Sequence, residues 1–115
     1  MQSFEQGDVV RVPFPYTDRA TRQWRPALVV SRGSLGEDGR LLWVAMITSA
    51  ENRPWPDDVP FGETYAQAGL PAPSIIRPCK LATIESAHAE KIGRASRELT
   101  RSVAAFLRRS LEPGG

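Results

Sequence analysis

The sequence predicts a mainly β protein with a C-terminal α-helix, in which the strands form a small β barrel. Short apolar runs rich in β-branched residues lie at 7–12, 26–31 and 41–47, separated by turn-forming residues, and this pattern is typical of strands. Apolar residues at helical spacing follow over 96–111. A chain of 115 residues can bury one core, so we expect a single domain over residues 1–115.

The composition is that of a packed globular protein. Hydrophobic residues make up 41% of the chain and charged residues 24%, which suits one core and a solvated surface. No window approaches the roughly 20 consecutive apolar residues of a membrane span, and the N-terminus is polar, so we expect no membrane partner and a cytoplasmic location. With one cysteine, Cys79, and one histidine, His88, the chain offers neither an internal disulfide nor a familiar zinc site. We therefore expect no metal and no cofactor.

The segment after the first strand is the first candidate for ligand binding. Pro13 and Pro15 are expected to end the strand, and residues 13–24 mix prolines, polar residues and cations without a clean period. Long ordered loops in small domains are often functional. Three side chains of this loop are placed where a ligand could be gripped: Arg19, Arg22 and Trp24. The alternative is a solvated loop with no role in binding.

Residues 41–47 form a nearly continuous apolar run, which predicts a central strand buried on both faces, with Trp43 in the core. The preceding residues 32–40 are rich in glycine and predict the turn of a hairpin. Thr48 and Ser49 end the strand with hydroxyl groups on a rigid element, which suits a site. Both hydroxyls could equally satisfy backbone groups at the strand end.

The proline-rich residues 51–60 cannot form an interior strand or a helix and predict a loop. Trp55 lies within it. Packing of its side chain onto the barrel is as good an interpretation as stacking on a nucleic-acid base. A helical turn is expected over 64–70, ending at Gly69.

The last predicted strands carry a break and two candidate cations. Residues 74–84 read as a strand in which Pro78 indicates an edge position or a bulge. Arg77 and Lys80 flank this break, and we expect them to be presented to solvent rather than buried. Residues 91–94 predict a short final strand that closes the barrel.

The C-terminal helix has clear start and stop signals. Ser96 is a good N-cap, Glu98 lies in the first turn, and Pro113 follows the last apolar position. Arg108 and Arg109 suit the negative end of the helix dipole. The apolar stripe expected to dock on the barrel comprises Leu99, Val103, Phe106, Leu107 and Leu111.

Several short motifs, taken in order, resemble the MazF/PemK family of toxin endoribonucleases from type II toxin–antitoxin systems. They are GDVV (7–10), RPALVVS (25–31), AMITS (45–49), AGL (68–70), SIIR (74–77) and TI (83–84). The resemblance implies an SH3-like β barrel with a C-terminal helix, a homodimer, and metal-independent cleavage of single-stranded RNA, usually mRNA. It also implies a cognate antitoxin whose disordered segment covers the RNA groove, with operator DNA bound only through that antitoxin.

The resemblance also implies candidate catalytic residues. Arg25 of the Arg-Pro pair and Thr48 at the end of the central strand match positions needed for cleavage in many members, and Arg77 matches a third in PemK-type members. Cys79 and Lys80 replace the Asp and Gln of those members. The residues expected to contact RNA are Arg19, Arg22, Trp24, Ser49, Trp55 and Lys80.

Metal-free RNA cleavage needs a proton acceptor at the 2′-oxygen, a donor at the leaving oxygen and cationic stabilisation of the pentacoordinate phosphorus. Arg25 and Arg77 suit the cationic role through their bidentate fork, and Thr48 or Ser49 can donate one further hydrogen bond. Arginine is a poor base because its pKa lies above about 12. His88 lies outside every motif and is interpreted as a surface residue, so the base stays unassigned.

Two alternative functions remain open at this point. One is a family member that binds its antitoxin and nucleic acid but cannot cut, as the replacements at Cys79 and Lys80 suggest. The other is a gyrase poison like CcdB, which shares the barrel. That class relies on an apolar, Trp-bearing C-terminal tip, and residues 111–115 carry none.

Overall fold

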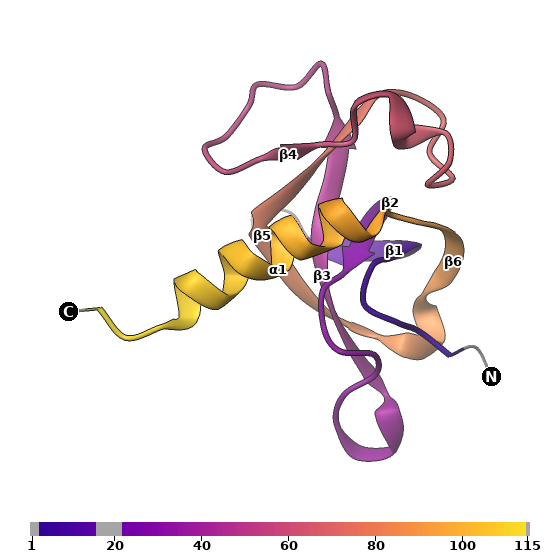
Figure 1. Cartoon of the computed structure of the whole chain (residues 1–115). Coiled ribbons are helices and arrows are strands. Elements are labelled where there is room, and N and C mark those ends of the chain that lie inside the picture. Colours follow the sequence, from indigo (N-terminus) through magenta and orange to yellow (C-terminus); the bar gives the residue numbers. More distant parts are fainter. Residues whose placement is uncertain (1–2, 16–21, 115) are drawn as a thin grey trace.

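The computed structural model describes residues 3–15 and 22–114, with backbone alone for residues 15, 22 and 23 (Figure 1). Its elements are β1 (Asp8–Pro15), β2 (Arg22–Val29), η1 (Glu37–Gly39), β3 (Leu41–Ser49), β4 (Val59–Pro60), η2 (Gly62–Tyr65), β5 (Ser74–Glu85), η3 (Ser86–His88), β6 (Glu90–Arg94) and α1 (Arg97–Leu111). Within these residues, no helix is long and apolar enough to cross a membrane. The predicted mainly β fold with a C-terminal helix is confirmed.

The described strands form one curled antiparallel sheet, a half-barrel, in the order β4-β5-β3-β2-β1-β6. β3 lies near the centre, as its apolar run predicted. β4 and β6 form the two edges, so the segments before β4 and around β6 lie at opposite sides of the sheet.

The sheet buries apolar side chains on both faces, which explains why β1, β2 and β3 read as nearly continuous apolar runs. One core lies on the face covered by α1, and we call it the helix-side core. It includes Val9, Leu28, Ala45, Ile47, Ile76 and Val103. The opposite core includes Val10, Val12, Phe14, Ala27, Val29, Val44 and Met46. Because neighbours in a strand alternate between faces, these two sets assign a face to every nearby strand residue.

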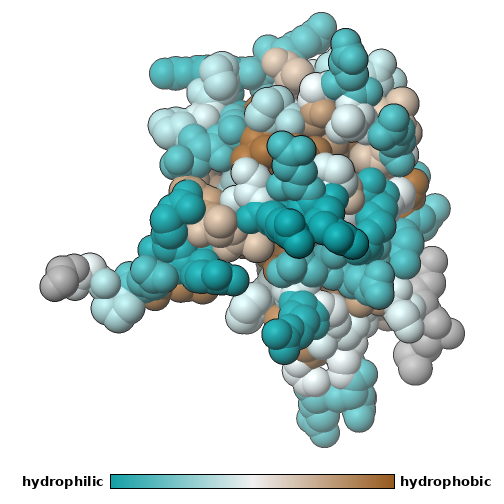
Figure 2. Space-filling view, viewed as in Figure 1, coloured by the Kyte–Doolittle hydropathy of each residue, from teal (hydrophilic) through white to brown (hydrophobic). Residues whose placement is uncertain are grey.

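The helix begins as predicted, since the Ser96 hydroxyl accepts a hydrogen bond from the Leu99 backbone N–H at 3.1 Å. Leu99, Val103 and Leu107 pack on the helix-side core. Leu111 is exposed, so the predicted stripe docks only over its first part. The end of the helix projects from the body in Figure 1, and Figure 2 shows hydrophilic side chains over its outward side.

Two glycines allow the backbone after η2 to touch β6 directly. A Cβ atom on Gly69 would overlap the Ile92 carbonyl oxygen, and one on Gly93 would overlap the Ala68 carbonyl oxygen. Gly69 also has φ +85°, where side chains other than glycine are strained. The AGL motif is thus required by the contact between the two chain segments.

The prediction that Pro13 ends the first strand was wrong, because β1 runs through Pro13 and has Pro15 as its last residue. β6 pairs with β1 only as far as Arg11, so beyond that residue β1 is an edge strand with β2 as its recorded neighbour. An edge strand tolerates prolines because one side of it needs no backbone donors. Residues 13–15 and 22–24 of the predicted loop are therefore strand, and residues 16–21 lie outside the described residues.

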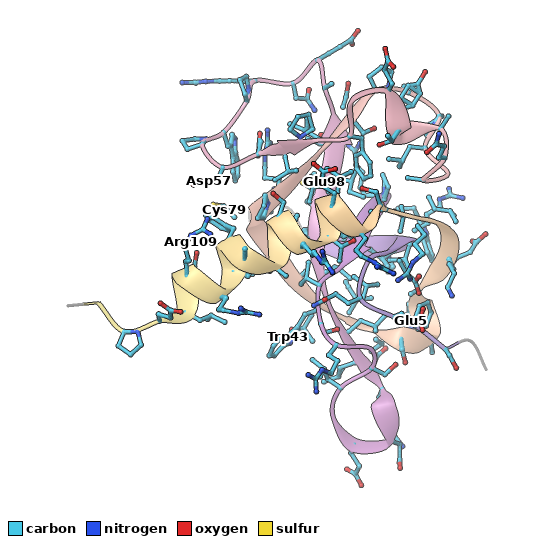
Figure 3. The ribbon with its side chains drawn as sticks, in the orientation of Figure 1. Glu5, Trp43, Asp57, Cys79, Glu98 and Arg109 are labelled. Carbon is cyan, nitrogen blue, oxygen red and sulfur yellow. The ribbon has the colours of Figure 1, made fainter. Side chains whose placement is uncertain are left out.

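Trp43 is 52% exposed, which corrects its prediction as a core residue. It pairs with Thr83 near the hairpin end of β3, and its side chain projects away from the ribbon in Figure 3. Trp43 lies on the same face of β3 as Ala45, but α1 covers this face at Ala45 and not at Trp43. The predicted bulge at Pro78 is confirmed, because the β3–β5 register shifts from Met46 opposite Arg77 to Ala45 opposite Leu81.

Candidate functional site

Thr48 and Arg77 are brought to one face of the sheet by the pairing of β3 with β5. Thr48 lies opposite Ile75, and Met46 lies opposite Arg77. Alternate residues of a strand share a face, so all four positions lie on the face of Met46 and the opposite core. Thr48 and Arg77 are therefore diagonal neighbours.

Arg25 reaches the same place through β2. The recorded β2–β3 pairs include Ala27 opposite Met46 and Val29 opposite Val44. Arg25 lies two residues before Ala27 on β2 and therefore on the same face. Arg25 is half-buried there. Three neighbouring strands thus bring the three candidate catalytic residues to one face of the sheet.

Arg77 is only 7% exposed, so the prediction that it would be presented to solvent was wrong. Its Nε donates to Asp58 Oδ1 at 3.2 Å, and its Nη2 donates to Asp58 Oδ2 at 3.0 Å and to the Arg53 carbonyl oxygen at 2.9 Å. The guanidinium carbon lies 4.2 Å from the centre of the Trp55 ring, within cation–π range. The segment between β3 and β4 folds back over the cation and buries it. The sequence signal at Pro78 predicted a bulge but not this cover.

Asp58 is ionised in this pair. Burial by itself would raise the pKa of its carboxyl group, but the Arg77 hydrogen bond, the Trp55 backbone N–H and the Arg77 charge together hold that pKa below its ordinary value. The Trp55 N–H donates to Asp58 Oδ2 at 2.8 Å. The carboxylate is therefore bound by both a side chain and the backbone.

Thr48 is buried at the end of β3, and its hydroxyl oxygen accepts a hydrogen bond from Asn52 Nδ2 at 2.6 Å. Asn52 is held in turn by its backbone N–H, which donates to the Ser49 carbonyl oxygen at 3.1 Å. In this arrangement Thr48 acts as an acceptor toward Asn52, and its hydroxyl proton is left to be donated.

The two predicted supporting contacts at this end of the sheet differ. Ser49 is exposed on the other face of β3, and its hydroxyl accepts from the Glu51 backbone N–H at 3.2 Å, which matches the capping alternative. Lys80 lies in the bulge of β5 between Arg77 and Leu81 and is partly exposed.

Of the aromatic residues predicted to contact RNA, only Trp55 lies beside the candidate site. Trp24 is exposed, but it precedes Arg25 and so points to the other face, where the Arg11 guanidinium lies 5.9 Å from its ring centre. Arg19 lies outside the described residues, and so does the Arg22 side chain.

His88 and Cys79 hold no place in the site. His88 is exposed in η3, at the far end of β5 from Arg77, with its Nδ1 3.3 Å from Glu85 Oε2, so the surface interpretation is confirmed. Cys79 is an exposed free thiol. In the described part of the chain no three His, Cys, Asp or Glu side chains are grouped to hold a metal.

Sequence reasoning missed Asp58 and Asn52, which hold Arg77 and Thr48. The one available signal was an acidic pair, Asp57-Asp58, in a proline-rich loop. The contacts of Asn52 with Thr48 and of Asp58 with Arg77 depend on how residues 50–58 fold back over the sheet. No local sequence pattern encodes that fold-back.

The comparisons with known proteins agree with this fold. Residues 5–111 match the family model described as the PemK-like, MazF-like toxin of type II toxin–antitoxin system. A comparison with curated proteins found no match.

Solved structures show the same fold at low sequence identity. A MazE–MazF complex from Deinococcus radiodurans has a TM-score of 0.73 and 19% identity, covering 99% of this chain and 100% of that one. An endoribonuclease with its cognate antitoxin from Mycobacterial species has a TM-score of 0.64 and 15% identity, covering 95% and 98%. The Mycobacterium tuberculosis toxin MazF-mt6 has a TM-score of 0.62 and 19% identity, covering 92% and 99%. With the family model matching nearly the whole sequence, the chain belongs to the PemK-like, MazF-like toxins of type II toxin–antitoxin systems.

Proposed function

We propose that the protein is an endoribonuclease that cleaves single-stranded mRNA without a metal ion. The observation that carries the proposal is that Arg25, Thr48 and Arg77 lie on the same face of three neighbouring strands, β2, β3 and β5. Two arginines and a hydroxyl donor are the groups that stabilise a pentacoordinate phosphorus.

In the proposed reaction the RNA 2′-oxygen attacks the adjacent phosphorus and the bond to the 5′-oxygen breaks. The 2′-hydroxyl loses its proton, the leaving 5′-oxygen gains one, and the products carry a 2′,3′-cyclic phosphate and a 5′-hydroxyl. Arg25 and Arg77 stabilise the phosphorane charge, and Thr48 donates a hydrogen bond to it. Asp58 is a poor proton acceptor, because its pKa is held below the ordinary value.

Single-stranded RNA binding is supported by the side chains around this face. Trp55 keeps 42% of its surface exposed beside the buried Arg77, so its free ring face can stack on a base. Arg53 and Lys80 add positive charge nearby. The proposed partners are this RNA, a second copy of the chain in a homodimer, and a cognate antitoxin, through which operator DNA would be bound.

The first test is incubation of the purified protein, in EDTA, with a long single-stranded RNA, followed by analysis of the fragment ends. Discrete cuts ending in 2′,3′-cyclic phosphate and 5′-hydroxyl are expected. Arg25→Ala should slow cleavage by about 100-fold or more while the circular dichroism spectrum is unchanged.

The matched control is Arg109→Ala, which removes an exposed arginine from the last turn of α1. It should cut like the wild type. A folded wild-type protein that binds RNA without any cleavage would contradict the proposal and favour the non-cutting alternative.

A further inference from the structure

The buried pair of Arg77 and Asp58 uses only one edge of the guanidinium group. Nε and Nη2 make all three recorded hydrogen bonds, whereas Nη1 donates to no described residue. Among the described residues, no buried side-chain nitrogen or oxygen lacks a hydrogen-bond partner. Nη1 is therefore the corner of the group that reaches solvent.

We propose that Asp58 is a positioning residue, which orients Arg77 so that Nη1 is presented to a phosphate oxygen of the substrate. This inference rests on the proposed nuclease function and deepens it. Asp58 contacts Arg77, and in this proposal it makes no contact with the RNA.

The backbone brings Asp58 close to Arg77. Asp58 directly precedes β4, in which Val59 pairs with Ile76, the residue before Arg77 on β5. The carboxylate is held independently by the Trp55 N–H at 2.8 Å. A side chain that adjoins a paired strand and is bound by a backbone donor can orient its partner, because its own freedom is limited.

The enclosure also limits how a phosphate can approach. The Trp55 ring stacks on the guanidinium at 4.2 Å, and Asp58 occupies the Nε–Nη2 edge. The corner that carries Nη1 is occupied by neither of them. The anion that holds Arg77 comes from the segment before β4 and not from β5, where the nearby Cys79 is an exposed free thiol.

The test compares two Asp→Asn variants of adjacent residues. Asp58→Asn removes the charge that holds Arg77, whereas Asp57→Asn makes the same chemical change at an exposed residue with φ +73°, a conformation that Asn tolerates. Single-turnover and steady-state cleavage of one RNA should show kcat lowered by about 10- to 100-fold in Asp58→Asn, with KM nearly unchanged. Asp57→Asn should match the wild type.

A double-mutant cycle separates positioning from a loss of loop structure. Arg77→Lys keeps a charge but has no fork, so adding Asp58→Asn to it should lower kcat little further. An equal loss in both backgrounds would overturn the inference, as would Asp58→Asn activity equal to that of Asp57→Asn. Faster cleavage by Asp58→Asn would also overturn it, because the pair would then withhold Arg77 from the RNA.

A readout that does not depend on cleavage completes the test. The Arg77 Nε–H proton should exchange slowly in nuclear magnetic resonance spectra of the wild type and Asp57→Asn, and rapidly in Asp58→Asn. Should Asp58→Asn not fold, Asp58→Glu keeps the charge and should retain slow exchange with a partial loss of kcat; fast exchange there would count against the inference. A wild type that cuts no RNA removes the proposed function, whereas an active wild type with an unaffected Asp58→Asn removes this inference alone.

Discussion

Two buried carboxylates at opposite edges of the sheet are bound by arginine in different ways. Asp8 of β1 is 2% exposed, and it accepts from Arg94 Nη1 at 2.7 Å, while Lys91 Nζ lies at 3.2 Å. Those cations remain 54% and 39% exposed. At Asp58 the carboxylate and its cation, Arg77, are both only 8% exposed.

The difference teaches what each pair does. Around Asp8 the protein buries only the anion, and the Glu5 backbone N–H also donates to it at 2.8 Å, so the pair ties the N-terminal segment to β1 and β6. Figure 3 shows Glu5 on this side of the molecule. Burying a cation as well costs more desolvation. At the candidate site both members of the Arg77–Asp58 pair are desolvated. Our proposal gives a reason for this, since it requires an oriented arginine there.

The largest effect is expected from removing both cations of Asp8. In the double variant Lys91→Gln/Arg94→Gln a buried carboxylate at the start of β1 keeps no cation, so the free energy of unfolding should fall by about 3–5 kcal/mol. Urea denaturation measures this. Glu5→Gln, which removes only the exposed partner of Arg94, should cost less than about 0.5 kcal/mol. A similar loss of unfolding free energy in the double variant and in Glu5→Gln would mean that Lys91 and Arg94 do not stabilise the protein through Asp8.

A smaller loss is expected at the other edge. Arg77→Gln leaves Asp58 without its cation, but the Trp55 N–H still donates to the carboxylate and water can reach it once the guanidinium is gone, so the free energy of unfolding should fall by about 1–3 kcal/mol. The same urea experiment checks it. A loss as large as that of the Asp8 variant would show that water does not reach the Asp58 carboxylate in Arg77→Gln.

Acid should remove the contribution of Asp58 in a definite direction. The pKa of Asp58 is lower in the folded protein than its ordinary value near 3.8, so its stabilisation is complete above that value and is lost as pH falls through the folded pKa. The stability gap between wild type and Asp58→Asn should therefore be constant from pH 7 to pH 5 and shrink below pH 4. A gap that widened in acid would contradict the ion pair.

The smallest effect is expected from the aromatic ring over Arg77. Trp55→Ala should lower the free energy of unfolding by about 1 kcal/mol, since the cation–π contact is lost while the Asp58 pair remains. Trp55→Phe keeps a ring and should lose less. Equal losses in the two variants would mean that packing of the indole edge, rather than the stacked ring face, is what stabilises Arg77.

Local elements could be read from the sequence because their causes are local. The Ser96 cap, the bulge at Pro78 and the strand at 41–49 each follow from a residue type acting on its own backbone. The prediction at Pro13 failed because a proline ends a strand only where a neighbouring strand requires a hydrogen bond from its backbone nitrogen.

The identity of the candidate site residues came from short motifs, but their environment did not. Arg25, Thr48 and Arg77 were named from the sequence, whereas their positions on one face of three neighbouring strands depend on strand order and register. Arg77 was expected in solvent and is buried, because a partner 19 residues away along the chain folds back over it.

The sequence by itself determined the order of strands and helix, the family and the residue types available for chemistry. The tertiary structure decided which face Trp24 and Trp43 occupy, which charges are buried, and which carboxylate binds Arg77. The physical reason is that capping, turn and alternation rules act over a few residues, whereas burial and ion pairing depend on segments brought together only when the sheet forms.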